Sequence, residues 1–205
     1  MNDTLSAIRE HFEFDLNQKE LPIKLRGDRR IHLLRIFRSA GFTNGAEIGI
    51  WEGDYSRQMF KRIPNLHLYC IDPWKSYGDF HETCNEDSLM EEAYQKTIEN
   101  TKGMNATILR CESLEAASNV PDGSLDFVFI DGNHNLPYTI ADLHTWIPKV
   151  RSGGIISGHD YVVKRYPPAD IHVRIAINAW VDAYLIRPWF LLTQSKWPTW
   201  FWIKE

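Results

Sequence analysis

From Ala46 onward, the chain alternates short apolar runs with longer stretches of helical periodicity. We predict strands over 46–50, 66–72, 106–110, 125–131 and 155–159, with helices over 54–62, 86–101, 113–118, 138–150 and 171–183. Such alternation favours right-handed crossovers and a mainly parallel sheet with helices on both faces. The predicted fold class is therefore α/β, in the form of a Rossmann-like three-layer α/β/α sandwich.

Two aromatic-rich runs, 185–193 and 199–204, close the chain and are joined by a short turn that contains proline. No helix separates them, so we predict an antiparallel hairpin at the C-terminal edge of the sheet. Alternation along 199–204 puts Trp200 and Trp202 on one face. We interpret that face as core packing, with the surface for a homodimer or another partner as the alternative.

The length of the chain, 205 residues, indicates a single domain over residues 1–205. Residues 3–16 and a second segment from about residue 28 have helical periodicity, and they precede the first predicted strand. We therefore expect an N-terminal helical extension over 1–40 and a Rossmann-like core over 41–205.

Composition and charge exclude some classes of binding partner. The formal net charge of −4 is no signature of polyanion binding, so we expect no nucleic acid partner. The N-terminus is polar and charged, and no apolar run approaches transmembrane length, so we expect no membrane partner. The three cysteines lack metal-binding spacing and are interpreted as reduced thiols, which predicts a cytoplasmic protein.

The first predicted strand runs into a turn with two glycines, Gly49 and Gly53, and then into a helix N-terminus. Glycine suits positions where the backbone comes close to a ligand or turns at positive φ. A helix N-terminus offers free N–H groups to a carboxylate or phosphate. Taken alone, the stretch is equally consistent with an ordinary strand–helix turn.

In such a sheet, ligands bind beyond the carboxyl ends of the strands. Asp72 closes the second strand and is placed to accept hydrogen bonds from a ribose diol, with a turn cap as the alternative. If Asp72 holds a ribose, then Glu112 and Ser113, after the third strand, sit where an adenine edge would lie. Ser113 could equally cap the following helix.

The fourth and fifth strand ends carry the groups best suited to chemistry. Asp131 ends a buried strand and needs a cation, a ligand amine or N–H groups as its partner. His134 follows in the same turn and suits proton transfer. His159 and Asp160 end the next strand, so Asp131 and Asp160 would converge around a cation or a shared proton. Carboxylate oxygens suit Mg²⁺, Ca²⁺ or Mn²⁺; the alternative is one acid capped by backbone and the other solvated.

These motifs resemble those of class I S-adenosylmethionine (SAM)-dependent methyltransferases. More narrowly, the chain resembles the small-molecule O-methyltransferase group with macrocin- and catechol-type enzymes, of the "methyltransferase domain 24" type. Three stretches carry the resemblance. Residues 46–56 match the acid-x-Gly-x-x-x-Gly motif, residues 68–74 match the second-strand acid followed by Pro-Trp, and residues 126–161 match a long pattern that runs from Asp-Gly-x-His to His-Asp-Tyr.

The resemblance implies a seven-stranded sheet with one antiparallel strand, and SAM as the cofactor. It implies that Glu47, Gly49, Ile50, Trp51 and Gly53 line the methionine end, that Asp72, followed by Trp74, holds the ribose, and that Glu112 and Ser113 border the adenine, with Asp131 also near the cofactor. It further implies a divalent cation such as Mg²⁺ on Asp131, His159 and Asp160, and His134, with Asp131, as the catalytic residues. Asn133 stands where relatives often have an acid, and His159 stands where macrocin-type relatives have one, so this metal site departs from the family pattern.

The implied reaction is methyl transfer to a hydroxyl of a small molecule, such as a sugar, a polyketide-like compound or an aromatic compound. We expect two aromatic-rich segments to wall the acceptor pocket. They are 73–85, with Trp74, Tyr77, Phe80 and His81, and 161–170, with Tyr161, Tyr166, Pro167 and Pro168.

Two other classes of protein are alternatives. A dinucleotide-binding oxidoreductase would need Gly-x-Gly-x-x-Gly spacing, which the first motif lacks. A non-catalytic binding or assembly protein on the same fold would need no joint geometry of Asp131, His134 and Asp160. Convergence of these three side chains therefore distinguishes an enzyme from a binding module.

Overall fold

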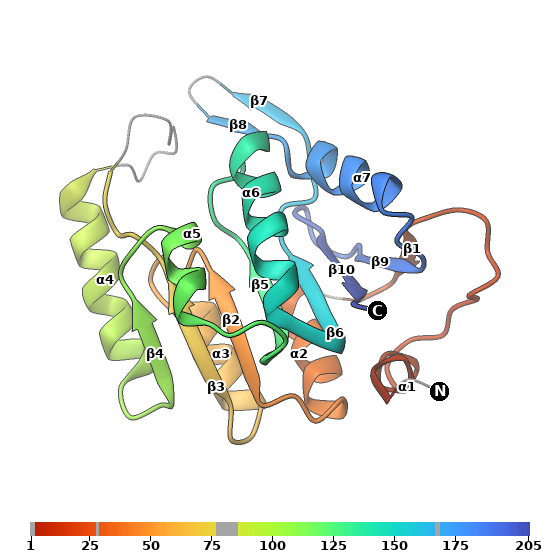
Figure 1. Cartoon of the computed structure of the whole chain (residues 1–205), viewed down its shortest axis with the longest axis horizontal. Coiled ribbons are helices and arrows are strands. Elements are labelled where there is room, and N and C mark those ends of the chain that lie inside the picture. The colour runs from red at the N-terminus through yellow and green to blue at the C-terminus, as the bar shows by residue number, and fades with distance from the viewer. Residues whose placement is uncertain (1–2, 28, 77–85, 167–168) are drawn as a thin grey trace.

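The computed structural model describes residues 3–27, 29–76, 86–166 and 169–205. Its centre is an eight-stranded sheet in the order β1-β9-β10-β6-β5-β2-β3-β4 (Figure 1). The strands are β1 (Ile23–Leu25), β2 (Asn44–Ile48), β3 (His67–Ile71), β4 (Ala106–Leu109), β5 (Leu125–Ile130), β6 (Val150–Gly158), β9 (Trp189–Leu192) and β10 (Thr199–Ile203). The helices are α1 (Asp3–Arg9), α2 (Arg29–Ser39), α3 (Asp54–Arg62), α4 (Asp87–Thr101), α5 (Ser113–Ala116), α6 (Leu136–Trp146) and α7 (Val173–Ala183).

The pairing confirms the predicted mainly parallel α/β sheet. Strands β4, β3, β2, β5 and β6 pair in parallel, whereas β10 runs antiparallel to both β6 and β9. The sheet has eight strands instead of seven because β1 pairs in parallel with β9. The C-terminal hairpin therefore lies next to the edge of the sheet, and β1 forms the edge itself.

Strand β1 was not predicted, since three residues give too short a pattern. Ile23 and Leu25 are each 1% exposed, while Lys24 between them is exposed. This alternation buries two side chains against the sheet through pairing with a strand more than 160 residues away. The segment 1–40 thus contributes a strand as well as helices α1 and α2.

Two apolar cores lie on the two faces of the sheet. Alternating side chains of β5 contribute to both cores. Phe127 and Phe129 belong to one core, and Val128 and Ile130 belong to the other. The first core includes side chains of α1, α2, α3 and α4, and the second includes side chains of α5, α6 and α7. Figure 1 shows α5 and α6 in front of the sheet and α2 and α3 behind it.

The tryptophans of β10 belong to the second core. Trp200 and Trp202 are 0% and 2% exposed, and their rings stack with centroids 5.4 Å apart. The interpretation as core packing is confirmed. The alternative is wrong for these two rings, because neither is exposed enough to form a surface for a second copy.

A second, two-stranded sheet follows β6. Strands β7 (Lys164–Tyr166) and β8 (Ala169–Ile171) pair antiparallel and stand above the strand ends in Figure 1. This hairpin occupies the segment 161–170, which was predicted as a wall of the acceptor pocket. Pro167 and Pro168 lie outside the described residues, as do Tyr77, Phe80 and His81 of the other predicted wall.

In the described part of the chain, no helix combines the length and the apolar character needed to cross a membrane.

Candidate active site

The site lies at the end of β2, between β3 and β5. The strand order reverses here, because β3 pairs on one side of β2 and β5 on the other. Gly49 follows β2 with φ of 82° and donates its N–H to the Ile71 carbonyl at 2.9 Å. A Cβ on Gly49 would lie 2.2 Å from the carbonyl oxygen of Asp131. Glycine is therefore required both for the backbone conformation and for the close approach of the β2 and β5 ends.

The turn after Gly49 is held in place by α4. Trp51 and Gly53 both have positive φ, 56° and 76°, and α3 begins at the next residue. The Thr97 hydroxyl on α4 donates to the Trp51 carbonyl at 2.7 Å. The predicted glycine turn and helix start thus form one fixed unit at the strand end.

Glu47 is buried within β2, with 1% of its surface exposed. The Ser56 hydroxyl on α3 donates to its Oε2 atom at 2.5 Å. A carboxylate so far from bulk water strongly favours a cationic or N–H partner. Its position below the glycine turn makes it available to a positively charged group in that turn.

Asp72 lies one strand further, at the end of β3. Its Oδ1 accepts the Trp74 N–H at 2.8 Å, and its Oδ2 accepts the Trp51 N–H at 3.1 Å. Burial raises the pKa of Asp72, and the backbone hydrogen bonds lower it in part. Asp72 therefore caps the turn, as the alternative interpretation had it. The Ile50 N–H also donates to this carboxylate, which has about four acceptor positions in all.

Trp74 supports this turn from the core. Its side chain is 1% exposed, its indole N–H donates to the Trp51 carbonyl at 2.7 Å, and its ring packs against Tyr94 with centroids 5.0 Å apart. The expectation that Trp74 walls an acceptor pocket is corrected here, because a ring packed this deeply presents no open face.

Glu112 and Ser113 have different surroundings. Glu112 is half exposed and pairs with Lys75, with 2.9 Å between Oε1 and Nζ. The Ser113 hydroxyl donates to Asp142 Oδ1 at 2.5 Å and accepts the Trp146 indole N–H at 2.8 Å. Ser113 is thus bound to α6, and the N-cap residue of α5 is Glu112, which makes no side-chain cap hydrogen bond.

Asp142 is a residue that the sequence reasoning missed. It is 6% exposed on α6, and burial raises its pKa to about 6, although the Ser113 hydrogen bond acts in the opposite direction. The available signal was an acid on the buried side of a predicted helix, next to Leu143 and four residues before Trp146. Such a carboxylate needs a partner inside the protein.

The raised pKa makes a testable prediction for stability. Because the folded-state pKa of Asp142, about 6, lies above the ordinary 3.8, the unfolded state loses its proton first as pH rises. The contribution of Asp142 to the free energy of unfolding is full below pH 4 and is lost as pH rises through 6, a change of about 3 kcal/mol. Denaturant unfolding of wild type and Asp142→Asn at pH 4 and pH 8 should show the variant gaining relative stability at pH 8. A pH-independent difference would contradict the assignment.

Three predicted residues converge above the sheet. The Nε2 atom of His134 lies 3.1 Å from Asp160 Oδ2 and 3.5 Å from Asp131 Oδ1. All three side chains are largely buried, with exposed fractions of 12–15%. Asp131, His134 and Asp160 offer one ligand atom each within 4.8 Å of one another. Two carboxylates around one imidazole suit a divalent cation or a transferable proton.

His159 takes a different place from the one expected. Its Nδ1 atom lies 2.7 Å from Asp160 Oδ1 and 3.8 Å from Asp131 Oδ1, and its side chain is 8% exposed. The predicted metal set was Asp131, His159 and Asp160, but the group with metal-binding geometry contains His134 instead of His159. His159 lies deeper because its carbonyl is held by the Trp200 indole N–H at 3.0 Å, and there its ring orients Asp160.

One cavity of about 360 Å³ joins the glycine turn to this cluster. Its lining comprises Glu47, Gly49, Ile50, Trp51, Glu52, Asp54, Tyr55, Asp131, His134 and Asp160. Except for Gly53, the predicted residues for the methionine end therefore share one space with Asp131, His134 and Asp160. Asp72, Trp74, Glu112 and Ser113 lie outside this lining, and so does His159.

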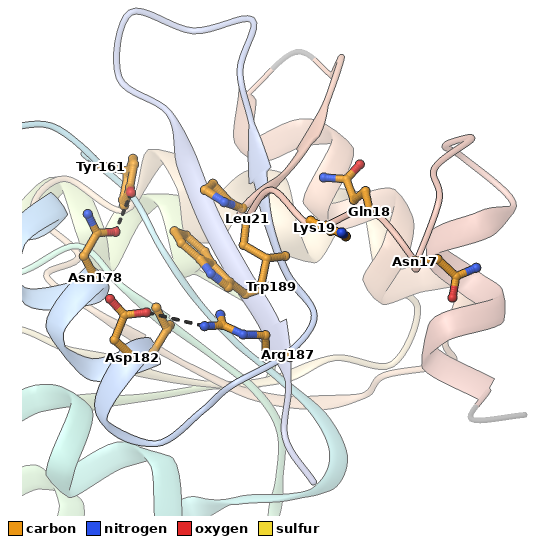
Figure 2. Close-up of a pocket in the computed structure, with 11 residues that line it drawn as sticks. Asn17, Gln18, Lys19, Leu21, Tyr161, Asn178, Asp182, Arg187 and Trp189 are labelled. Carbon is orange, nitrogen blue, oxygen red and sulfur yellow. Dashed lines mark hydrogen bonds and ion pairs between the residues drawn. The ribbon is translucent and has the colours of Figure 1, made fainter.

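A second, larger cavity of about 570 Å³ lies between residues 17–22, α7 and β9 (Figure 2). Figure 2 shows the Tyr161 hydroxyl turned toward Asn178, to which it donates at 2.6 Å. Tyr161 was expected to wall the acceptor pocket together with the rest of 161–170. It lines this second cavity instead, because its ring packs edge-on against Trp189 with centroids 5.6 Å apart.

Comparison with known proteins places this site in a family. A family model described as a methyltransferase domain (Methyltransf_24) matches residues 46–161. One curated relative, the uncharacterized protein y4gI of Sinorhizobium fredii, is 27% identical over 100 residues, and these cover 48% of this chain. The match spans only 10% of the length of that relative.

Solved structures share the fold at low sequence identity. A Staphylococcus aureus protein proposed to be a caffeoyl-CoA O-methyltransferase superposes with a TM-score of 0.65 at 15% identity, covering 98% of this chain and 90% of its own. The O-methyltransferase NovP superposes with a TM-score of 0.59 at 16% identity, covering 85% and 79%. The family match covers more than half of the chain and spans the turn, the acids and the histidines just described. The chain therefore belongs to the Methyltransf_24 family of class I SAM-dependent methyltransferases.

Proposed function

We propose that this protein transfers the methyl group of SAM to a hydroxyl of a small molecule, in the cavity between the glycine turn and the Asp131–His134–Asp160 cluster. The observation that carries the proposal is that these three side chains converge on the cavity that Glu47, Gly49 and Trp51 also line. A protein that used this fold only for binding would not need that joint geometry.

The cofactor is proposed to lie along the strand ends. The buried Glu47 carboxylate suits the amino group at the methionine end, and the turn from Gly49 to Gly53 gives the close approach that this end needs. Asp72 is proposed to accept from the ribose hydroxyls with the acceptor capacity that its backbone hydrogen bonds leave. Glu112 and Ser113 are proposed to border the adenine.

The acceptor hydroxyl is proposed to lie against His134. The methyl group on a sulfonium is already activated, so the protein mainly aligns the oxygen nucleophile with it. His134 Nε2 lies between two carboxylate oxygens, which would stabilise the imidazolium that forms when the ring takes the hydroxyl proton. Asp131 and Asp160 thereby position the base.

The same three residues fit a divalent cation. Asp131, His134 and Asp160 would hold it with two oxygen ligands and one nitrogen ligand within 4.8 Å of one another. Such a cation would supply Lewis-acid help with the loss of the hydroxyl proton. His159 would then orient the Asp160 carboxylate from behind, across 2.7 Å.

The two described structural neighbours give additional support for oxygen as the methylated atom, since both carry the name O-methyltransferase. Their identity to this chain, at 15% and 16%, is too low to indicate the acceptor. A sugar, a polyketide-like compound and an aromatic compound therefore all belong in a first screen.

Transfer of tritium from [methyl-³H]SAM tests the proposal. The acceptors would be catechol, caffeic acid and methyl glycosides, each assayed with Mg²⁺ and with EDTA. We expect transfer to at least one hydroxylated acceptor, a loss of about tenfold or more with EDTA, and recovery when Mg²⁺ is added back.

The variant Asp160→Asn should lose the response to Mg²⁺, and Asp122→Asn, at an exposed position far from the cluster, should keep it. Transfer that is insensitive to EDTA would contradict the role of the metal and leave His134 as the base. An absence of transfer to oxygen, with transfer to a nitrogen or sulfur acceptor, would overturn the proposed acceptor class.

A further inference from the structure

The starting point is the hydrogen-bond chain from α6 to the end of β4. Trp146 donates its indole N–H to Ser113 Oγ at 2.8 Å, and Ser113 donates its hydroxyl hydrogen to Asp142 Oδ1 at 2.5 Å. The direction of the first bond is fixed because an indole N–H can only donate, and that of the second because an ionised carboxylate can only accept. Ser113 therefore has no hydroxyl hydrogen left for a ligand, and Asp142 Oδ1 is occupied.

The other oxygen of Asp142 is placed differently. Oδ2 points toward Gly132 at the end of β5, 3.6 Å from the position that a Cβ on Gly132 would take. Within the residues that the structure describes, this oxygen accepts no hydrogen bond, although Asp142 is only 6% exposed. Oδ2 is not one of the fully buried atoms that lack a partner, so it can be reached, and a carboxylate oxygen placed in this way can accept a hydrogen from a ligand.

The position of Asp142 Oδ2 limits which hydrogen-bond donor could reach it. Asp142 Oδ2 lies between Gly132, which follows β5, and Ser113, which follows β4. In the proposed function, the ribose sits on Asp72 at the end of β3, and the purine extends toward Ser113. The outer edge of an adenine carries an exocyclic amino group, which is a hydrogen-bond donor.

We propose that Asp142 selects adenine, because its Oδ2 accepts a hydrogen from the exocyclic amino group of the cofactor. This inference rests on the proposed placement of SAM and adds a residue that determines specificity for the base. Ser113 has a positioning role, since its hydrogen bond holds the other carboxylate oxygen and so fixes the direction of Oδ2.

The network also dictates what an asparagine would do at this position. Ser113 Oγ accepts from Trp146, and its hydroxyl hydrogen needs an acceptor, which residue 142 supplies in wild type and would supply through its amide oxygen in the variant. The amide oxygen of Asn in Asp142→Asn would therefore face Ser113, and its NH₂ group would take the place of Oδ2. The site would then present a donor, which opposes the amino group of adenine and matches the C6 carbonyl of hypoxanthine.

The test compares S-adenosylhomocysteine with S-inosylhomocysteine, its deaminated counterpart, by calorimetric titration at pH 8, where Asp142 is ionised. We expect wild type to bind the adenine form at least tenfold more tightly. In Asp142→Asn, the ratio of the two dissociation constants should change by at least tenfold in favour of the inosine form. The control Glu115→Gln changes an exposed acid on α5 and should leave the ratio as in wild type.

The outcomes separate this inference from the proposed function. If wild type binds S-adenosylhomocysteine without preferring it to the inosine form, the inference is overturned while the proposed cofactor site stands. That result does not depend on the folding of any variant. An unchanged ratio in folded Asp142→Asn would also overturn it, because a purely structural carboxylate would alter both affinities equally. If neither compound binds wild type, the proposed function falls as well.

Discussion

Gly49→Ala is expected to lower the free energy of unfolding by about 3 kcal/mol or more. The added Cβ would lie 2.2 Å from the Asp131 carbonyl oxygen, and this is backbone that cannot rotate away. The φ of 82° adds the strain of a left-handed conformation. The ends of β2 and β5 would have to separate, and this would also move Asp131.

Gly41→Ala is the matched control. Gly41 has a similar φ of 69°, but among the described residues nothing lies within 4 Å of a Cβ added there. The free energy of unfolding of Gly41→Ala should fall only by the cost of the left-handed conformation, about 1 kcal/mol. Urea unfolding followed by tryptophan fluorescence measures both variants. Equal losses would show that the β2–β5 contact imposes no steric limit.

His134→Gln is expected to lower kcat for methyl transfer by about 10²- to 10⁴-fold, the range for loss of a general base. The dissociation constant of SAM should change by less than about threefold, because His134 directs its Nε2 atom toward the two carboxylates. Single-turnover kinetics and calorimetry together separate these two effects.

His144→Gln provides the control on the same helix. His144 is exposed on α6, away from the cavity, so its replacement should leave kcat and SAM binding near wild-type values. If His134→Gln instead abolished SAM binding with little change in kcat, His134 would belong to the cofactor site and a different base would be needed.

The sequence predicted the parts of the fold that have a strong local pattern. Strands β2 to β5 and helices α3, α4 and α7 fall close to their predicted ranges, since apolar periodicity alone defines them. Strand β1 was missed because only its pairing with β9 makes it a strand. Strand β6 begins at Val150, earlier than predicted, because Gly153 and Gly154 resemble a turn. A Cβ on Gly154 would lie 2.5 Å from the Asp126 carbonyl oxygen, so this glycine permits close strand packing.

In the candidate site, too, the local pattern predicted some residues, while others depend on long-range packing. The rule that ligands bind at strand ends found Asp131, His134 and Asp160, because a parallel sheet gathers its carboxyl ends at one edge. It could not decide which histidine lies between the acids, since that depends on the loop geometry around Asp160, whose φ is 54°. The strand-end rule could not identify Asp142, because α6 brings this side chain to the strand ends only by docking on α5.

Calorimetric titration of SAM into wild type and Asp72→Ala tests the central claim most directly, with thermal melting to verify that the variant is folded. We predict that wild type binds SAM, that Asp72→Ala loses measurable binding, and that the exposed control Asp122→Ala binds as wild type does. An absence of SAM binding by wild type, or equal affinity in folded Asp72→Ala, would contradict the proposed cofactor site at the strand ends.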